Sequence, residues 1–131
     1  MKVISKDKLR RRRDRERLAL ELKIIDCMGP SPFIQQFYLA FETTTSVFMV
    51  IGLYSGGDLF FHLLERINSC GTAFSEQEVC VLLAELTLAL EHVHREGFIH
   101  RDLKMENVML DSSGHVKLID FGLAVELTDE V

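Results

Sequence analysis

The chain has 131 residues, of which 47% are hydrophobic, and its formal net charge is −5. These values are ordinary for one globular domain, and the negative charge argues against nucleic-acid binding by bulk electrostatics. Three cysteines (Cys27, Cys70 and Cys80) without a CxxC pair favour free thiols in a reducing compartment over a disulfide framework or zinc site. The chain begins with charged residues and lacks an apolar signal segment, and its longest apolar stretch, Val79–Leu90, is too short to span a bilayer. We therefore expect an intracellular protein of the cytoplasm, with the nucleus as the alternative.

The first part of the chain predicts a strand, a helix and a hairpin. Apolar and β-branched residues predict a strand over 1–5. Apolar residues at helical spacing predict a helix over 7–27, which ends at Gly29-Pro30-Ser31-Pro32. The runs Phe37–Phe41 and Val47–Ile51 predict a β-hairpin.

The middle of the chain predicts a connector followed by two helices. Residues 52–57 show no regular periodicity, and we expect a flexible connector there. A short helix is predicted over Asp58–Ile67, with a loop over Asn68–Ala73. Ser75-Glu76-Gln77-Glu78 is a capping box that opens a helix over Glu76–Arg95. Because that helix is apolar on most of its circumference, it should be buried on several sides.

Two motifs near the C-terminus point to chemistry. The first is His100-Arg101-Asp102-Leu103-Lys104-Met105-Glu106-Asn107, and the second is Asp120-Phe121-Gly122. Between them we predict two strands, 107–110 and 115–119, joined by a turn at 111–114. A three-residue motif alone recurs by chance. Here residue types, order and spacing together match the chemical half of a phosphoryl-transfer site.

In these motifs the chain resembles the eukaryotic protein kinases over nearly its whole length. The resemblance implies an incomplete α+β kinase-like fold that runs from the third strand of the small lobe to the start of the activation segment. Residues 1–51 would be the small-lobe part, 52–57 the hinge, and 58–131 the start of the large lobe. Gly-Gly-Asp-Leu-Phe-Phe-His-Leu and the residues around Asp120 also resemble the AGC group, near the S6 and Akt-type kinases.

The resemblance assigns catalytic and metal-binding roles. Asp102 would accept the proton of the attacking hydroxyl, and Lys104, typical of serine/threonine kinases, would neutralise charge on the transferring phosphoryl group. Asn107 and Asp120 would hold the Mg²⁺ ions that bridge the phosphates of ATP.

The nucleotide-binding roles start with an ion pair. Lys2 would contact the ATP phosphates and pair with Glu21, although an isolated lysine or glutamate is more often a solvated surface charge. Asp58 would hydrogen-bond the ribose, or cap the following helix, or do both. Met109 would lie under the adenine, a role compatible with that of a buried core methionine.

The hinge is expected at Gly52, Leu53 and Tyr54, whose backbone groups would bind the adenine edge, with Ile51 as the gatekeeper behind it. Most members of the family carry an acidic residue where Gly52 stands. This departure should loosen the connector, but backbone-mediated binding need not be lost.

Arginines dominate residues 10–17, which invites a nucleic-acid-binding or localisation interpretation. A solvated helix face is favoured, because acidic residues interleave. In the AGC group, a basic residue at the position of Arg17 binds an activation-segment phosphate together with the residue at Arg101. By the same resemblance, an apolar column between the lobes would be formed by Ile25, Phe37, His100 and Phe121.

No glycine-rich loop precedes Lys2 in this sequence and no Ala-Pro-Glu follows Asp120. We therefore expect the 131-residue chain by itself to bind Mg-ATP weakly at most and to turn over negligibly. The partners would be ATP, a protein substrate with Ser or Thr, and an upstream activating kinase, without a membrane or nucleic acid. The alternatives are a non-catalytic kinase-like regulatory or binding module and a small-molecule phosphotransferase.

Overall fold

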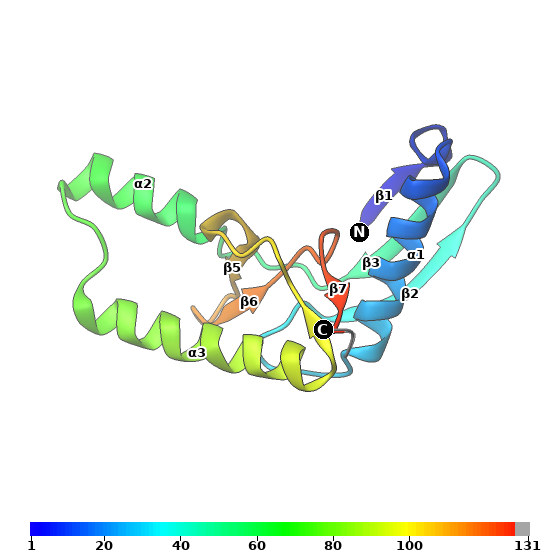
Figure 1. The fold of residues 1–131 in the computed structure, drawn as a ribbon. Helices are drawn as coiled ribbons and strands as arrows, with labels where there is room; N and C mark the ends of the chain where they lie inside the picture. Colours follow the sequence, from blue (N-terminus) through cyan, green and yellow to red (C-terminus); the bar gives the residue numbers. More distant parts are fainter. Residues whose placement is uncertain (128–131) are drawn as a thin grey trace.

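A three-stranded sheet and one long helix form the N-terminal part of the computed structural model, which describes residues 1–127. The strands are β1 (Lys2–Ser5), β2 (Phe37–Glu42) and β3 (Ser46–Ile51), antiparallel in the order β1-β3-β2. The helix α1 (Arg12–Cys27) lies against the sheet (Figure 1). On β3, burial alternates with period two, which is the pattern of a strand with one covered face.

Two helices and two short strand pairs form the rest of the molecule. Helices α2 (Leu59–Cys70) and α3 (Glu76–Arg95) lie at the end opposite to the sheet (Figure 1). The strands pair antiparallel, β4 (Phe98–Ile99) with β7 (Val125–Glu126) and β5 (Val108–Leu110) with β6 (Val116–Leu118). The predicted order of elements is confirmed. Strands β4 and β7 were not predicted, because two residues are too few to show a strand pattern in the sequence.

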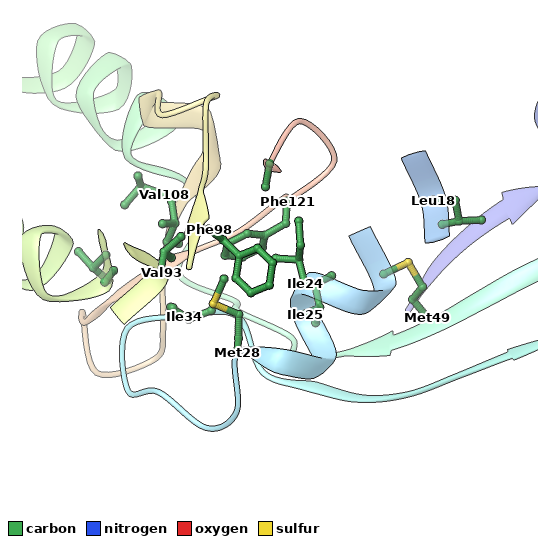
Figure 2. Close-up of a cluster of buried hydrophobic side chains, with 14 of the residues drawn as sticks. Leu18, Ile24, Ile25, Met28, Ile34, Met49, Val93, Phe98, Val108 and Phe121 are labelled. Carbon is green, nitrogen blue, oxygen red and sulfur yellow. The ribbon is translucent and has the colours of Figure 1, made fainter. Parts of the chain in front are cut away.

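The hydrophobic core runs from the sheet to α3. Leu18 of α1 lies near Met49 of β3, and farther along Ile24 of α1 and Met28, just after α1, converge with Phe98 (Figure 2). Its fully buried non-aromatic apolar side chains are Ile24, Met49, Ala89, Val93, Val108, Val116 and Leu118. Because α1 and the β5–β6 region contribute to one core, the two parts of the molecule are held together by apolar burial.

Residues Phe33–Gln36, between α1 and β2, add a polar connection to β6. Ile34 forms a parallel bridge with Leu118. Leu118 N donates to Phe33 O over 2.8 Å, and Gln35 N donates to Leu118 O over 2.9 Å. This segment is therefore attached to β6 just before the chain enters β2.

The predicted helix over 7–27 is wrong at its start. A 3₁₀ turn, η1, occupies Lys6–Leu9, and α1 begins only at Arg12 because Arg11 is extended. The Ser5 hydroxyl accepts from Asp7 N, and Lys6 N donates to Thr45 O, so local and sheet contacts hold this turn. Leu9 also packs against the core from this position.

Helix α3 begins and ends at the predicted residues, and its capping box is present. Helix α2 was predicted too short, since it continues through Asn68 to Cys70 and the loop begins at Gly71. Gly71 adopts φ 68°, and its N–H bonds Ile67 O, which is a left-handed helix cap that favours glycine. Gly71 is therefore the feature of the sequence that marks the end of α2.

The strands before and after the turn at 111–114 are shorter than predicted. Asn107 belongs to a 3₁₀ turn, η2 (Met105–Asn107), and β6 does not include His115 or Ile119. The connector 52–57 lacks regular structure, as predicted. Hydrogen bonds fix both of its ends: Gly52 N donates to Gln36 O over 2.8 Å, and Gly56 N to Leu110 O over 3.1 Å. The predicted large-lobe segment extends to residue 131, and its residues 128–131 lie outside the described part.

Helix α3 is apolar but not covered on all sides. Its exposed apolar side chains are Val79, Val81, Leu83 and Leu88. The predicted burial of this helix on several sides is therefore not realised within residues 1–127. None of the described helices has the length and apolar character that a membrane span requires.

Candidate active site

An ion pair joins the sheet to α1 at the front of the candidate site. Lys2 Nζ lies 2.6 Å from Glu21 Oε1 and 3.6 Å from Asp120 Oδ1. Glu21 belongs to the buried stripe of α1, one turn from both Leu18 and Ile25. A carboxylate on such a stripe is costly unless it is paired, and Lys2 supplies the partner. The structure thus brings together the lysine and glutamate that the sequence paired.

The catalytic loop is ordered around Asp102. Asp102 Oδ2 accepts from Lys104 Nζ over 2.7 Å and from Asn107 Nδ2 over 2.9 Å. Asn107 Nδ2 also donates to the Asp102 main-chain oxygen over 2.9 Å. The hydrogen bond from Lys104 is the largest cause that lowers the pKa of Asp102, and the same bond raises the pKa of Lys104. Asp102 is therefore an ionised acceptor at neutral pH.

Each of the two motifs contains one strained backbone position. Arg101 has φ 62° and Asp120 has φ 60°, the two non-glycine residues with positive φ among the described residues. Such conformations cost on the order of 1–3 kcal/mol each and cluster at functional sites. Side chains hold the nearby main chain: Arg101 Nε donates to Leu123 O over 2.8 Å, and Arg17 Nε to Gly122 O over 2.7 Å.

The buried His100 side chain contacts residues of both motifs. It is 1% exposed, and its ring meets the Phe121 ring edge-on at 5.0 Å. Nε2 lies 3.0 Å from Ile119 O, and Asp102 N donates to Nδ1 over 3.3 Å. Since a carbonyl oxygen only accepts, the proton sits on Nε2. One buried ring thus supports the backbone of Asp102 and the residue before Asp120.

A hollow of about 380 Å³ lies beside these groups. Its polar lining comes from both parts of the molecule and includes Lys8, Asp14, Arg17, Glu21, Asp102 and Asp120. Two of its carboxylates, Glu21 and Asp102, are already paired with Lys2 and Lys104.

Of the residues assigned to the adenine and ribose, Asp58 and Met109 lie side by side. Asp58 caps α2 by accepting from Phe61 N over 2.8 Å, and it forms a β-bridge with Met109. Ile51 ends β3 opposite Phe37, and Leu53 is 92% exposed. The cap interpretation of Asp58 is confirmed, whereas the ribose and adenine roles stay predictions.

The donor set suits a magnesium ion that also binds phosphates. Asn107 uses its amide nitrogen on Asp102, which leaves the amide oxygen for a cation, and Asp120 offers a half-exposed carboxylate. Mg²⁺ in nucleotide sites takes one or two protein carboxylates or amides and completes its shell with phosphates and water. Within residues 1–127, no group of three or more His, Cys, Asp or Glu residues is arranged to hold a metal ion by itself.

Sequence reasoning missed several contacts of this region. Tyr54 was predicted only as a backbone contributor, but its hydroxyl accepts from Gln36 N over 2.7 Å. Glu85 of α3 accepts from Val116 N over 2.8 Å and contacts His115. No sequence signal marks either contact, because each joins residues whose proximity depends on the fold.

The order of the elements, the two converging motifs and the Lys2–Glu21 pair define a protein kinase domain, and comparison with known proteins agrees. Residues 1–131 match the family described as protein kinase domain, and the chain belongs to this family.

Its relatives include ribosomal S6 kinases. The chain is 42% identical over 132 residues to ribosomal protein S6 kinase alpha-4 of Homo sapiens, covering 99% of this chain and 16% of that protein. It is 43% identical over 129 residues to ribosomal protein S6 kinase alpha-2 of Mus musculus, covering 98% and 17%. Protein kinase 2 of Dictyostelium discoideum is 40% identical over 131 residues, covering 98% and 26%. The predicted likeness to S6 kinases is confirmed, and the chain spans about a sixth of their length.

Proposed function

We propose that this chain carries part of the nucleotide and phosphoryl-transfer site of a protein serine/threonine kinase. The observation that supports this most directly is the convergence of Lys2, Glu21 and Asp120 beside the Asp102 loop. A scaffold that only binds a partner does not require these groups together. The alternative of a non-catalytic regulatory module is therefore not favoured.

Asp102 would act as the proton acceptor. Its carboxylate is ionised, since its pKa is lowered chiefly by Lys104. It would accept the hydroxyl proton of a Ser or Thr side chain while that oxygen bonds to the γ-phosphorus of ATP and ADP departs. Lys104 would balance charge on the transferring group, and its presence favours a protein Ser or Thr substrate.

Asn107 and Asp120 would hold Mg²⁺, which when bound neutralises charge on the ATP phosphates. Lys2, fixed by Glu21, would contact these phosphates. Ile51, Leu53 and Met109 would surround the adenine, and Asp58 would bond the ribose. We also propose an upstream activating kinase as a partner and the cytoplasm, or the nucleus, as the location.

The 131-residue chain taken by itself should bind Mg-ATP weakly and transfer phosphate negligibly. Titration of the chain with Mg-ATP, followed by NMR, tests the nucleotide site. Asp120→Asn should remove the magnesium dependence of binding, while Asp26→Asn, at an exposed carboxylate on α1, should not.

Two kinds of result would contradict what we expect of the chain by itself. If the chain does not respond to Mg-ATP at millimolar concentrations, or responds equally with Asp120→Asn, it lacks the proposed nucleotide site. Phosphate transfer by the purified chain that is lost in Asp102→Asn would refute the expected inactivity and support the proposed role of Asp102.

A further inference from the structure

Tyr54 folds back over Gly52 within the connector between the two parts of the molecule. Its hydroxyl oxygen lies 2.6 Å from the position that a β-carbon on Gly52 would take, and its ring carbon Cζ lies 2.9 Å away. Carbon atoms do not approach neighbours this closely without displacement. A residue with a side chain at position 52 is therefore incompatible with Tyr54 in this position.

Gly52 and Tyr54 both form hydrogen bonds with the main chain of Gln36. Gly52 N donates to Gln36 O over 2.8 Å, and Gln36 N donates to the Tyr54 hydroxyl oxygen over 2.7 Å. Tyr54 is half-buried, and burial is the largest cause that raises its pKa. The hydroxyl thus stays protonated and neutral near pH 7, and it accepts the bond through a lone pair.

This contact continues toward the strand that leads to Asp120. Gln35, next to Gln36, donates its N–H to Leu118 O of β6 over 2.9 Å. The Lys117 ammonium, also on β6, lies 5.9 Å from the centre of the Tyr54 ring. A cation at this distance is attracted to the face of the ring. Tyr54 therefore touches both the segment before β2 and the strand before the proposed metal ligand.

We propose that Gly52, Tyr54 and Gln36 form a clasp that fixes the hinge backbone where it binds adenine, with Tyr54 as a positioning residue for nucleotide binding. For its ligand, the inference rests on the proposed function. Its geometry rests on the described contacts alone. Gly52, which departs from the usual acidic residue, makes room for Tyr54, so the two positions should depend on each other.

The first test removes only the hydroxyl. Tyr54→Phe should accelerate amide hydrogen exchange at Gln36 about two- to tenfold, as expected when one hydrogen bond of ordinary net strength is lost. Tyr38→Phe, at the chain's other tyrosine, 63% exposed, is the matched control and should leave Gln36 unchanged. Unchanged exchange at Gln36 in Tyr54→Phe would overturn the clasp.

The second test separates positioning from general stability. Tyr54→Phe should weaken Mg-ATP binding about two- to tenfold, by the same hydrogen-bond strength. It should leave binding of Mg-tripolyphosphate unchanged, because the phosphates would bind Lys2 and Asp120 and not the hinge. Equal weakening of both ligands would mean a structural role only and would overturn the positioning of the hinge.

The third test is a double-mutant cycle. Gly52→Ala should lower the free energy of unfolding and weaken Mg-ATP binding when Tyr54 is present. In a Tyr54→Leu background the same change should be neutral or stabilising, because the obstructing hydroxyl is gone and alanine restricts the unfolded chain. Additive effects would contradict the mutual dependence. If the unmodified chain binds no Mg-ATP, the proposed function fails, and Gln36 exchange and the unfolding cycle still decide the clasp.

Discussion

The carboxylates of Glu21 and Asp102 lie in one site but differ in their burial and in the groups that bond to them. Glu21 is 7% exposed and lies on the apolar stripe of α1, where its partner is Lys2. The Asp102 side chain is 26% exposed and receives hydrogen bonds from Lys104 and Asn107. Burial alone would disfavour a charge, so the hydrogen bonds to the ionised form decide the state of Asp102.

Removal of the Lys104 ammonium should therefore raise the pKa of Asp102. Lys104→Met deletes the largest cause of its lowered value and retains the bond from Asn107. The measurement is a carboxyl-carbon NMR titration of Asp102. Lys23→Met, at a lysine that pairs with Glu126 instead, should leave the Asp102 pKa unchanged. An unaltered Asp102 pKa in Lys104→Met would show that Asn107 alone sets it.

A second residue-scale pair should make stability depend on pH. His115 Nδ1 lies 2.7 Å from Glu85 Oε1, and this hydrogen bond is the largest cause that raises the pKa of His115 above its model-compound value of 6.5. Of the other groups facing His115, Asp111 raises this pKa and Lys117 lowers it. Because the folded-state pKa is the higher one, the stabilisation is complete below about pH 6.5 and is lost as pH rises through the folded-state value.

Urea unfolding between pH 5.5 and 9 measures this dependence. The difference in unfolding free energy between the unmodified chain and His115→Gln should be largest at the acidic end and shrink toward pH 9. His94→Gln, at an exposed histidine of α3, should show no such trend. A difference that is constant across the range would mean that protonation of His115 does not stabilise the fold.

At the scale of elements, the α2–α3 connection depends on polar groups at one helix end. The Ser75 hydroxyl accepts from Glu78 N, and Glu78 accepts from Ser75 N over 2.8 Å. Arg66 of α2 donates two hydrogen bonds of 2.8 Å to Glu78. The Arg66 bonds are the largest cause that lowers the pKa of Glu78 to about 2. Glu78 thus serves both the start of α3 and its attachment to α2.

Ser75→Ala should lower the unfolding free energy by about 1 kcal/mol, the usual effect of losing an N-cap hydroxyl. Circular dichroism during urea unfolding is the measurement. Ser112→Ala, in the exposed turn between β5 and β6, is the matched control and should change stability by less than about 0.5 kcal/mol. Equal effects of the two substitutions would show that the cap adds nothing.

Local signals explain which elements could be predicted. The capping box and the apolar residues after it predicted both ends of α3, and two apolar runs predicted the β2–β3 hairpin to within one residue at each end. The break before α1 was missed because Lys6 N bonds Thr45 O, a contact set by the sheet. In the site, the resemblance correctly predicted that Lys2 pairs with Glu21, because a family motif carries information on residues far apart in the sequence. Tyr54 with Gln36 lies outside any motif, and only the fold reveals it.

At the scale of the whole molecule, the core joins both parts but leaves apolar surface exposed along α3. An apolar groove of about 310 Å³ lies between α3 and the catalytic loop, and its lining includes Val79, Leu83 and Leu103. Val79 is 37% exposed and Leu83 is 56% exposed. Contiguous exposed apolar surface of this kind promotes association. The 131-residue chain should therefore self-associate as its concentration rises.

Substitution of this face should restore a monomer without loss of stability. Val79→Glu with Leu83→Lys replaces two exposed apolar groups by an i, i+4 pair that favours the helix by about 0.2–0.5 kcal/mol. Sedimentation velocity over a range of concentrations should show association of the unmodified chain and a monomer for the double variant. Tyr38→Glu, at a 63% exposed side chain of β2, should associate like the unmodified chain. If the Tyr38 variant becomes monomeric and the α3 double variant still associates, the chain associates through the sheet and not through α3.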